Sequence, residues 1–215
     1  MRVCIIYAHP NEDSFTRNIR DSFIAGLESA GHCYVISDLY AMNFNGDMSE
    51  AEYEREAFYR KDLPLPPDVI AEQEKINSCD AIAFIFPLFW SDAPAKLIGW
   101  FTRVWTYGFA YGENRSMKQL EKGLVLISAG NTMDYFQGTG ILNALEKIML
   151  DDRLGDRVKQ KELIIFDGTS RELALRKQNW DSHLNRAFQA GTQIGKMSSE
   201  DFTQRHRGAK IAKGN

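Results

Sequence analysis

The chain alternates short, fully apolar runs with amphipathic stretches, and this alternation restricts the fold more than any other feature of the sequence. The first run, residues 3–8, is continuous, as expected for a parallel strand buried on both faces. A helical pattern follows and ends at Gly31, with Ser14 or Asp13 as its N-cap. A second strand is expected at residues 33–38, so the first part of the chain predicts a βαβ unit.

The alternation continues along most of the chain. Further strands are expected at residues 81–86, 124–128 and 163–166, and further helices at 49–58, 69–77, 95–104 and 173–194. This pattern predicts one α/β domain over residues 1–195, built as a doubly wound five-stranded parallel sheet in three layers. Residues 39–67 interrupt the pattern and are interpreted as an insertion, and the polar residues 196–215 as a C-terminal tail.

The composition excludes several classes of function. A net charge of −3 and a sequence pI of about 5.9 give no tendency to bind nucleic acid or anionic membranes. No apolar run approaches the ~20 residues of a membrane helix, so no membrane insertion is expected. Cys4, Cys33 and Cys79 have neither metal-ligand nor CxxC spacing, and no metal is expected. They are interpreted as buried thiols of a reducing compartment, and the protein as cytoplasmic.

A doubly wound sheet binds its ligand beyond the carboxyl ends of its strands, and the loop after the first strand suits an anion. Ser14, Phe15 and Thr16 open the first helix, where free backbone N–H groups and the helix dipole attract negative charge. His9 adds an imidazole. Taken alone, Ser14 reads as an N-cap and His9 as a loop histidine with a satisfied hydrogen bond. The GxGxxG and GxxxxGK motifs are absent, which excludes the dinucleotide and P-loop fingerprints.

The loops after the third and fourth strands, residues 87–94 and 129–140, are expected at the same edge of the sheet. The first of them opens with apolar residues where a polar turn is expected: Pro87, Leu88, Phe89 and Trp90. A flat aromatic ligand needs such a wall, and packing beneath the next helix is the alternative. The fourth strand leads into small residues whose backbone suits a ligand edge or an ordinary turn: Ser128, Ala129, Gly130 and Asn131.

These loops carry a family resemblance. The matching stretches are Ala8-His9 with Ser14-Phe15, Ser37 to Phe44 (SDLYAMNF), Phe86 to Trp90 (FPLFW), Pro94-Ala95, Gly99 to Phe101, Arg103-Val104 and Phe109 to Tyr111 (FAY). Up to about Phe166, the chain resembles the flavodoxin-like NAD(P)H:quinone oxidoreductases, the DT-diaphorase family. The spacing among the later stretches is highly specific.

The resemblance implies a flavodoxin-like fold, a tightly bound flavin and two-electron hydride transfer from NAD(P)H to a quinone, azo or nitro compound in a ping-pong cycle. It also implies a homodimer with the active site at its interface. The residues implied to line the flavin are His9, Ser14, Phe15, Thr16, Pro87, Leu88, Phe89, Trp90, Ser128, Ala129, Gly130 and Asn131. Those implied at the substrate are Trp90, Tyr135 and, across the interface, Tyr111, and the residues proposed for catalysis are Tyr135 and Gly130.

The chain departs from the family pattern at several of these positions. The best-studied members have a Thr-Thr-Gly-Gly loop where this chain has Ser128 to Asn131. The tyrosine and histidine that support charge on their reduced flavin are replaced by Asp134, with Tyr135 beside it, and by Gly140. Glu113 replaces a second tyrosine of the pocket. The stretch from Ser37 to Phe44 is closest to FAD-binding members, which favours FAD over FMN.

Two other functions fit the same fold. One is a flavin-binding regulatory subunit of a potassium-efflux-type transporter, for which the charged stretch from Glu50 to Lys61 is a docking site or, as we expect, a solvated face. The other is a small electron-carrier flavodoxin, which fits less well because carriers are usually shorter and more acidic. Carriers also need no aromatic cover such as Trp105, Tyr107, Phe109 and Tyr111.

Overall fold

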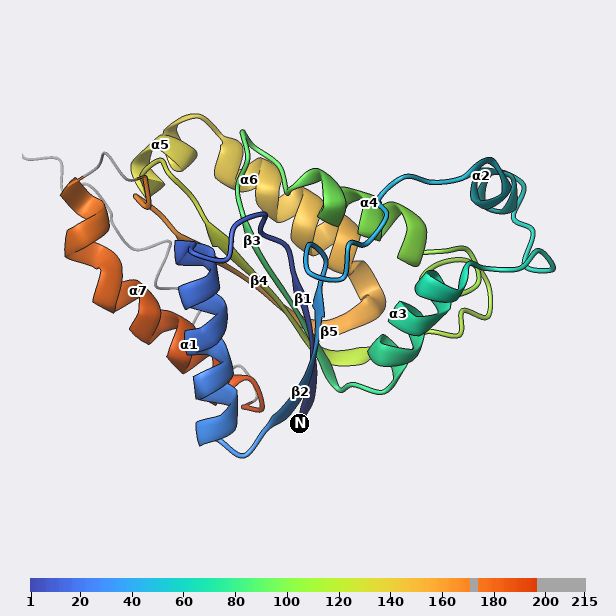
Figure 1. Cartoon of the computed structure of the whole chain (residues 1–215), viewed down its shortest axis with the longest axis horizontal. Helices are drawn as coiled ribbons and strands as arrows, with labels where there is room; N and C mark the ends of the chain where they lie inside the picture. Colours follow the sequence, from blue (N-terminus) through green and yellow to red (C-terminus); the bar gives the residue numbers. More distant parts are fainter. Residues whose placement is uncertain (171–173, 197–215) are drawn as a thin grey trace, which may run out of the picture.

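The computed structural model describes residues 1–170 and 174–196, and its centre is one parallel β-sheet with helices on both faces (Figure 1). The strands are β1 (Arg2–Tyr7), β2 (Cys33–Asp38), β3 (Ala81–Pro87), β4 (Leu120–Ser128) and β5 (Val158–Phe166). They pair in the order β2-β1-β3-β4-β5, and every pair is parallel. The predicted doubly wound, five-stranded fold in three layers is confirmed.

The strands form where the sequence is continuously apolar, because their side chains are buried on both faces of the sheet. All seven residues of β3 are buried, as are the last five of β1. β4 and β5 begin several residues before the predicted positions. Their amino-terminal halves carry charged residues that pair between the strands, such as Lys122 with Glu162 at 3.5 Å and Lys159 with Glu121 at 2.7 Å.

Helices α1 (Phe15–Ser29) and α7 (Ala174–Gln193) cover one face of the sheet (Figure 1). They pack closely because glycines face each other: a Cβ on Gly26 would lie 2.0 Å from the Phe188 carbonyl oxygen. A Cβ on Gly191 would lie 2.2 Å from the Phe23 carbonyl oxygen. The predicted start of the last helix, at residue 173, and nearly all of the predicted tail lie outside the described residues.

Helices α3 (Pro67–Asn77) and α4 (Ala95–Val104) contribute to the core on the opposite face. Trp100, which is fully buried, donates from Nε1 to the equally buried carboxylate of Glu72 at 2.9 Å. Trp105 donates from Nε1 to the Arg153 carbonyl at 2.8 Å. Trp100 of α4 and Trp105, which caps this helix, therefore join it to α3 and to the segment that precedes β5.

The segment between β4 and β5 corrects the prediction of a loop over residues 129–140. The loop is short, and Thr132 caps α5 (Met133–Gly138), which α6 (Ile141–Leu145) follows. A π-helical segment (Glu146–Leu154) and a short 3₁₀ turn (Gly155–Arg157) complete the connection. Glycines interrupt these short helices and no long amphipathic period develops, so the sequence pattern does not reveal them.

The predicted insertion contains the predicted short helix, α2 (Glu50–Ala57), which Ser49 and Glu52 start with a capping box. Its interpretation as a solvated face is wrong for two residues, because Glu52 and Arg55 are buried. Glu52 accepts a hydrogen bond from Arg103 Nε at 2.7 Å, and Asp68 accepts one from Arg103 Nη1 at 2.6 Å. A buried ion cluster therefore joins the insertion to α3 and α4.

The structure shows how far the three cysteine thiols are buried and whether any described helix could cross a membrane. Cys4 and Cys79 are buried, but Cys33 is exposed at the start of β2, so the expectation of three buried thiols is wrong for Cys33. The first position of an edge strand is open to solvent even when apolar residues follow it. Among the helices of residues 1–170 and 174–196, none has the length and apolar character needed to cross a membrane.

Candidate active site

Hydrogen bonds join the loops that follow β1, β3 and β4 at the carboxyl edge of the sheet. The hydroxyl groups of Thr16 and Ser128 lie 2.7 Å apart. Leu88 N–H donates to the Ser128 carbonyl at 2.8 Å, and Ala8 N–H donates to the Ile85 carbonyl at 3.1 Å. The three loops predicted to form a site are therefore side by side, next to the β1–β3 junction where the strand order switches direction.

The first loop leads into the N-terminus of α1. The Ser14 hydroxyl accepts a hydrogen bond from Arg17 N–H at 3.1 Å, so Ser14 is the N-cap. The first turn carries no acidic side chain, which leaves the positive end of the helix dipole open to an anion. Thr16 is buried and its hydroxyl is bonded to Ser128, so this side chain joins two loops instead of facing solvent.

His9 precedes this helix and has a local partner. Asn11 N–H donates to its Nδ1 at 3.0 Å, as expected for a loop histidine with a satisfied hydrogen bond. Burial lowers the pKa of His9 below its ordinary value, and the Asn11 carbonyl, 2.8 Å from Nδ1, opposes this effect because it can accept a proton held there. The imidazole is therefore neutral at pH 7.

The second loop is a tight turn that holds an aromatic side chain out of the protein. Phe89 N–H donates to the Asp92 carbonyl at 2.9 Å, and Asp92 N–H donates back at 3.1 Å. Trp90, between them, has a φ of 57°, a left-handed conformation that costs about 1–2 kcal/mol for a residue with a side chain. Its side chain is 99% exposed, and that of Phe89 is 45% exposed. The turn thus presents two aromatic rings to a ligand or partner.

The third loop, unlike the second, exposes mainly backbone to solvent. Ser128 and Ala129 are buried, whereas Gly130 and Asn131 are exposed. A Cβ on Gly130 would be in ordinary contact with Ser170, at 3.7 Å, and the residue itself is open to solvent. Tyr135, in the first turns of α5, is 47% exposed. Gly130, Asn131 and Tyr135 therefore lie on the solvent side of this loop.

A fourth segment, which the sequence prediction missed, supports the third loop. After β5, the Asp167 carboxylate accepts a hydrogen bond from Met133 N–H at 2.9 Å. Gly168 N–H donates to the Asn131 carbonyl and Thr169 N–H to the Ala129 carbonyl, both at 2.9 Å. The Asp-Gly pair directly after an apolar strand was the available sequence signal for a turn at this edge.

Tyr111 lies with the insertion and not with the other predicted site residues. Its hydroxyl donates to the Glu56 carboxylate at 2.9 Å, which together with burial raises the pKa of Tyr111 well above its ordinary value. Glu56 belongs to α2, which Figure 1 shows at the opposite end of the molecule from α5. Within one chain, Tyr111 is therefore separated from Tyr135.

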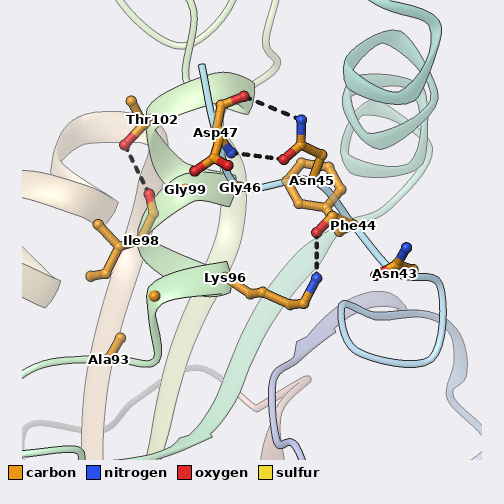
Figure 2. A pocket seen from close by; sticks show the side chains of 11 residues that line it. Asn43, Phe44, Asn45, Gly46, Asp47, Ala93, Lys96, Ile98, Gly99 and Thr102 are labelled. Atoms are coloured by element: carbon orange, nitrogen blue, oxygen red, sulfur yellow. Dashed lines mark hydrogen bonds between the residues drawn. The ribbon is translucent and has the colours of Figure 1, made fainter. Parts of the chain in front are cut away.

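A pocket of about 790 Å³ opens beside α4, between its first turns and residues 43–47 of the insertion (Figure 2). Lys96 crosses it and donates to the Phe44 carbonyl at 2.7 Å, so its ammonium group has a hydrogen-bond partner within the protein. None of the predicted site residues lines this pocket. Gly99 meets Gly46 at its floor, where a Cβ on Gly99 would lie 2.3 Å from the Gly46 carbonyl oxygen.

The loops that follow β1, β3 and β4, which we call the loop cluster, have the features that a flavin requires. The α1 N-terminus suits a phosphate group, the exposed aromatic turn suits a flat ring system, and the open backbone at Gly130 suits a polar ring edge. These features lie on neighbouring strands in the order β1, β3, β4. In residues 1–170 and 174–196, no cluster of histidine, cysteine or acidic side chains could hold a metal ion.

Comparison with known proteins identifies the family. A family defined by the flavodoxin-like fold matches residues 1–153. The solved structure of an NAD(P)H:quinone oxidoreductase from Methanothermobacter marburgensis is 44% identical, has a TM-score of 0.87, and aligns over 93% of this chain and 99% of its own. The chain belongs to the flavodoxin-like NAD(P)H:quinone oxidoreductase family. The resemblance stated from the sequence motifs is thereby confirmed.

Eukaryotic members of the NAD(P)H:quinone oxidoreductase family are more distant. NAD(P)H dehydrogenase (quinone) 1 of Rattus norvegicus is 33% identical over 165 residues, which is 69% of this chain and 60% of the rat protein. Ribosyldihydronicotinamide dehydrogenase (quinone) of Homo sapiens is 31% identical over 159 residues, 65% of this chain and 68% of the human protein. The chain thus spans about 60% of the rat relative's length.

Proposed function

We propose that this protein is a flavoenzyme that oxidises NAD(P)H and reduces quinones, or related azo or nitro compounds, by two-electron hydride transfer in a ping-pong cycle. The observation that carries the proposal is the Phe89–Asp92 turn, which exposes Trp90 fully at the end of β3, the strand next to β1, whose loop leads into α1. Contiguous exposed apolar groups mark binding surfaces, and Phe89, which is also exposed, adjoins Trp90 in this turn. The family membership supports the same activity.

The loops divide the work of holding the flavin. The first turn of α1, with Ser14, Phe15 and Thr16, takes the phosphate end, because it offers backbone N–H groups and no competing carboxylate. Phe89 and Trp90 frame the ring system. The backbone at Gly130 and Asn131 donates to the pyrimidine edge, where negative charge collects on reduction. The flavin itself supplies the hydride chemistry, and the protein supplies position and electrostatics.

We assign to Tyr135 the role of stabilising the charge on the reduced flavin at this edge. It lies one residue beyond Asp134, which replaces the tyrosine of the family's best-studied members, and its ring is half exposed on the solvent side of the third loop. Gly130 acts with it through its backbone. Tyr111 acts on the substrate from a second copy of the chain, since within one chain it is bonded to α2, far from α5. The proposed enzyme is therefore a homodimer.

Extraction of the cofactor provides the direct test. The purified protein is expected to show the visible absorption bands of oxidised flavin, which bleach on addition of NADPH or NADH without any acceptor. The mass of the extracted cofactor distinguishes the proposed FAD from FMN. Re-oxidation by quinone, azo and nitro compounds then ranks the acceptors. A colourless protein that also fails to bind added FAD and FMN would overturn the proposal.

Replacement of the exposed indole separates binding from folding. We predict that Trp90→Ala lowers flavin affinity by up to about tenfold, because aromatic stacking contributes about 0.5–1.5 kcal/mol. The free energy of unfolding without flavin should be unchanged or slightly higher, since no packing is lost from a side chain that is 99% exposed. Flavin titration and urea unfolding measure the two quantities. An unchanged flavin affinity would remove the turn from the site.

A further inference from the structure

Asp167 connects two parts of the protein that support the third loop. Its carboxylate accepts the Met133 N–H at 2.9 Å, and Met133 is the first residue of α5. Its backbone carbonyl lies 2.9 Å from Nε2 of His183, a residue of α7 that is 5% exposed. The loop from Ala129 to Thr132 is therefore held through Asp167 by a histidine that lies outside the loop cluster.

The surroundings of His183 suit a neutral imidazole. Nε2–H donates to the Asp167 carbonyl, which leaves Nδ1 as an acceptor 3.5 Å from Nη1 of Arg186. Phe15 and Phe166 pack around the ring, with centroids 6.1 and 5.7 Å away. Burial lowers the pKa of His183 below its ordinary value; the Asp167 backbone hydrogen bond and carboxylate oppose this, and Arg186 adds to it. In the described part of the chain, Arg186 and Asp167 are the charged groups that face the ring.

Protonation of His183 would change both of its polar contacts. A proton on Nδ1 would point at the guanidinium of Arg186, which would keep the Ile165 carbonyl as an acceptor but lose the imidazole. The new charge would also attract the Asp167 carboxylate, whose Oδ1 lies 4.0 Å from Nε2. The other oxygen of that carboxylate, Oδ2, is the acceptor for Met133 N–H. A shift of the carboxylate toward the imidazolium would therefore move the acceptor that holds the first turn of α5.

We propose that His183 is a positioning residue for the flavin site: its neutral imidazole holds Asp167 where it keeps α5 and the 129–132 loop in the flavin-binding arrangement, and its protonation weakens flavin binding. The inference rests on the proposed function. It adds a residue that does not itself touch the flavin. Phe15, in the first turn of α1, packs against the same ring, so the first loop also responds to this histidine.

The test is the flavin affinity at pH 7.5 and pH 5.5, measured by calorimetry with FAD and with FMN on protein freed of cofactor. His183→Gln keeps a donor for the Asp167 carbonyl and an acceptor for Arg186 but does not titrate. We expect its affinity at pH 7.5 to stay within about twofold of wild type. Between the two pH values, the wild-type affinity should fall up to about fivefold more than that of the variant, which corresponds to a one-unit difference in pKa between free and bound protein for a histidine that titrates at or below about 6.5.

Several controls isolate this effect. The FMN phosphate, with a second pKa of about 6, and His9 also titrate in this range, but both are present in every variant and cancel in the comparison with wild type. His32→Gln removes a histidine that contacts the N-terminal amino group at 3.1 Å, outside the site, and should keep the wild-type pH profile. Asp167→Asn keeps an acceptor for Met133 N–H without the charge and should reduce the fall, as His183→Gln does.

A readout without flavin follows the loop directly. The amide resonance of Met133 should shift with pH at the midpoint of the His183 ring resonances, and His183→Gln should abolish that transition. Equal pH profiles of flavin affinity in wild type, His183→Gln and Asp167→Asn would overturn the positioning role and leave the proposed function intact. Failure of every variant and the wild type to bind either flavin at pH 7.5 would overturn both.

Discussion

Arg103 places a guanidinium that is 5% exposed between carboxylates of two different segments. Glu52 of α2 and Asp68 of α3 accept its hydrogen bonds at 2.7 and 2.6 Å, and the Asn45 carbonyl accepts another at 2.7 Å. The arginine in turn keeps the pKa of Asp68 below its ordinary value. Because a buried charge is costly without partners, the cluster makes the position of the insertion depend on one side chain of α4.

We predict that Arg103→Ala lowers the free energy of unfolding by about 3–5 kcal/mol, because it leaves the Glu52 carboxylate buried without its cation. Urea unfolding at pH 7.5 measures the loss. Arg60→Ala is the matched control, since Arg60 pairs with Asp62 on the surface, at 2.5 Å, where solvent screens the pair. A similar small change in both variants would show that the insertion does not depend on the cluster.

At the scale of elements, the contact between α1 and α7 determines where His183 lies. The backbones of the two helices approach at Gly26 and Gly191, where neither position has room for a side chain. Additional contacts join them along their length, such as the Ser22 hydroxyl donating to the Leu184 carbonyl at 2.9 Å. Since Leu184 is next to His183, the helix contact and the support of the third loop share one element.

Gly26→Ala should therefore destabilise the protein although alanine is the better helix former. The gain in helix propensity is about 0.5–1 kcal/mol, whereas overpacking costs about 1–3 kcal/mol. A Cβ placed 2.0 Å from the Phe188 carbonyl oxygen can be relieved only by backbone movement. Thermal and urea unfolding are expected to show a net loss. Gly138→Ala, with no atom within 4 Å of its Cβ, should be neutral or stabilising, and the opposite order of the two variants would contradict this account.

At the scale of the whole molecule, the apolar runs predicted the sheet because parallel strands that are buried on both faces consist of continuous apolar residues. The loops at the carboxyl edge were predicted because strand order in such a sheet places them together. The short helices after residue 132 were missed for lack of a sustained period. His183 was missed for a different reason: it reaches Asp167 only because α7 packs on α1, and no local pattern encodes that contact.

The stability of the whole protein is expected to fall between pH 7.5 and pH 5.5. Burial lowers the pKa values of His9, His32 and His183, so the folded state favours the neutral rings and loses stability as pH drops through about 6.5. The carboxylates with lowered pKa, such as Glu52 and Asp68, keep their contribution until the pH falls to about 4.5. Urea unfolding of flavin-free protein tests the sign. Constant or rising stability in this window would contradict it.

The exposed position of Trp90 also makes the chain its own optical reporter. Of the four tryptophans, Trp90 is 99% exposed, Trp180 is partly buried against Phe15, and Trp100 and Trp105 are buried. An indole in water emits at longer wavelength than one in an apolar core, so the red edge of the intrinsic emission belongs chiefly to the Phe89–Asp92 turn. A second copy of the chain that covers that turn will remove the red edge and leave the blue emission of the core in place, whereas a bound flavin, which absorbs indole emission, will lower both.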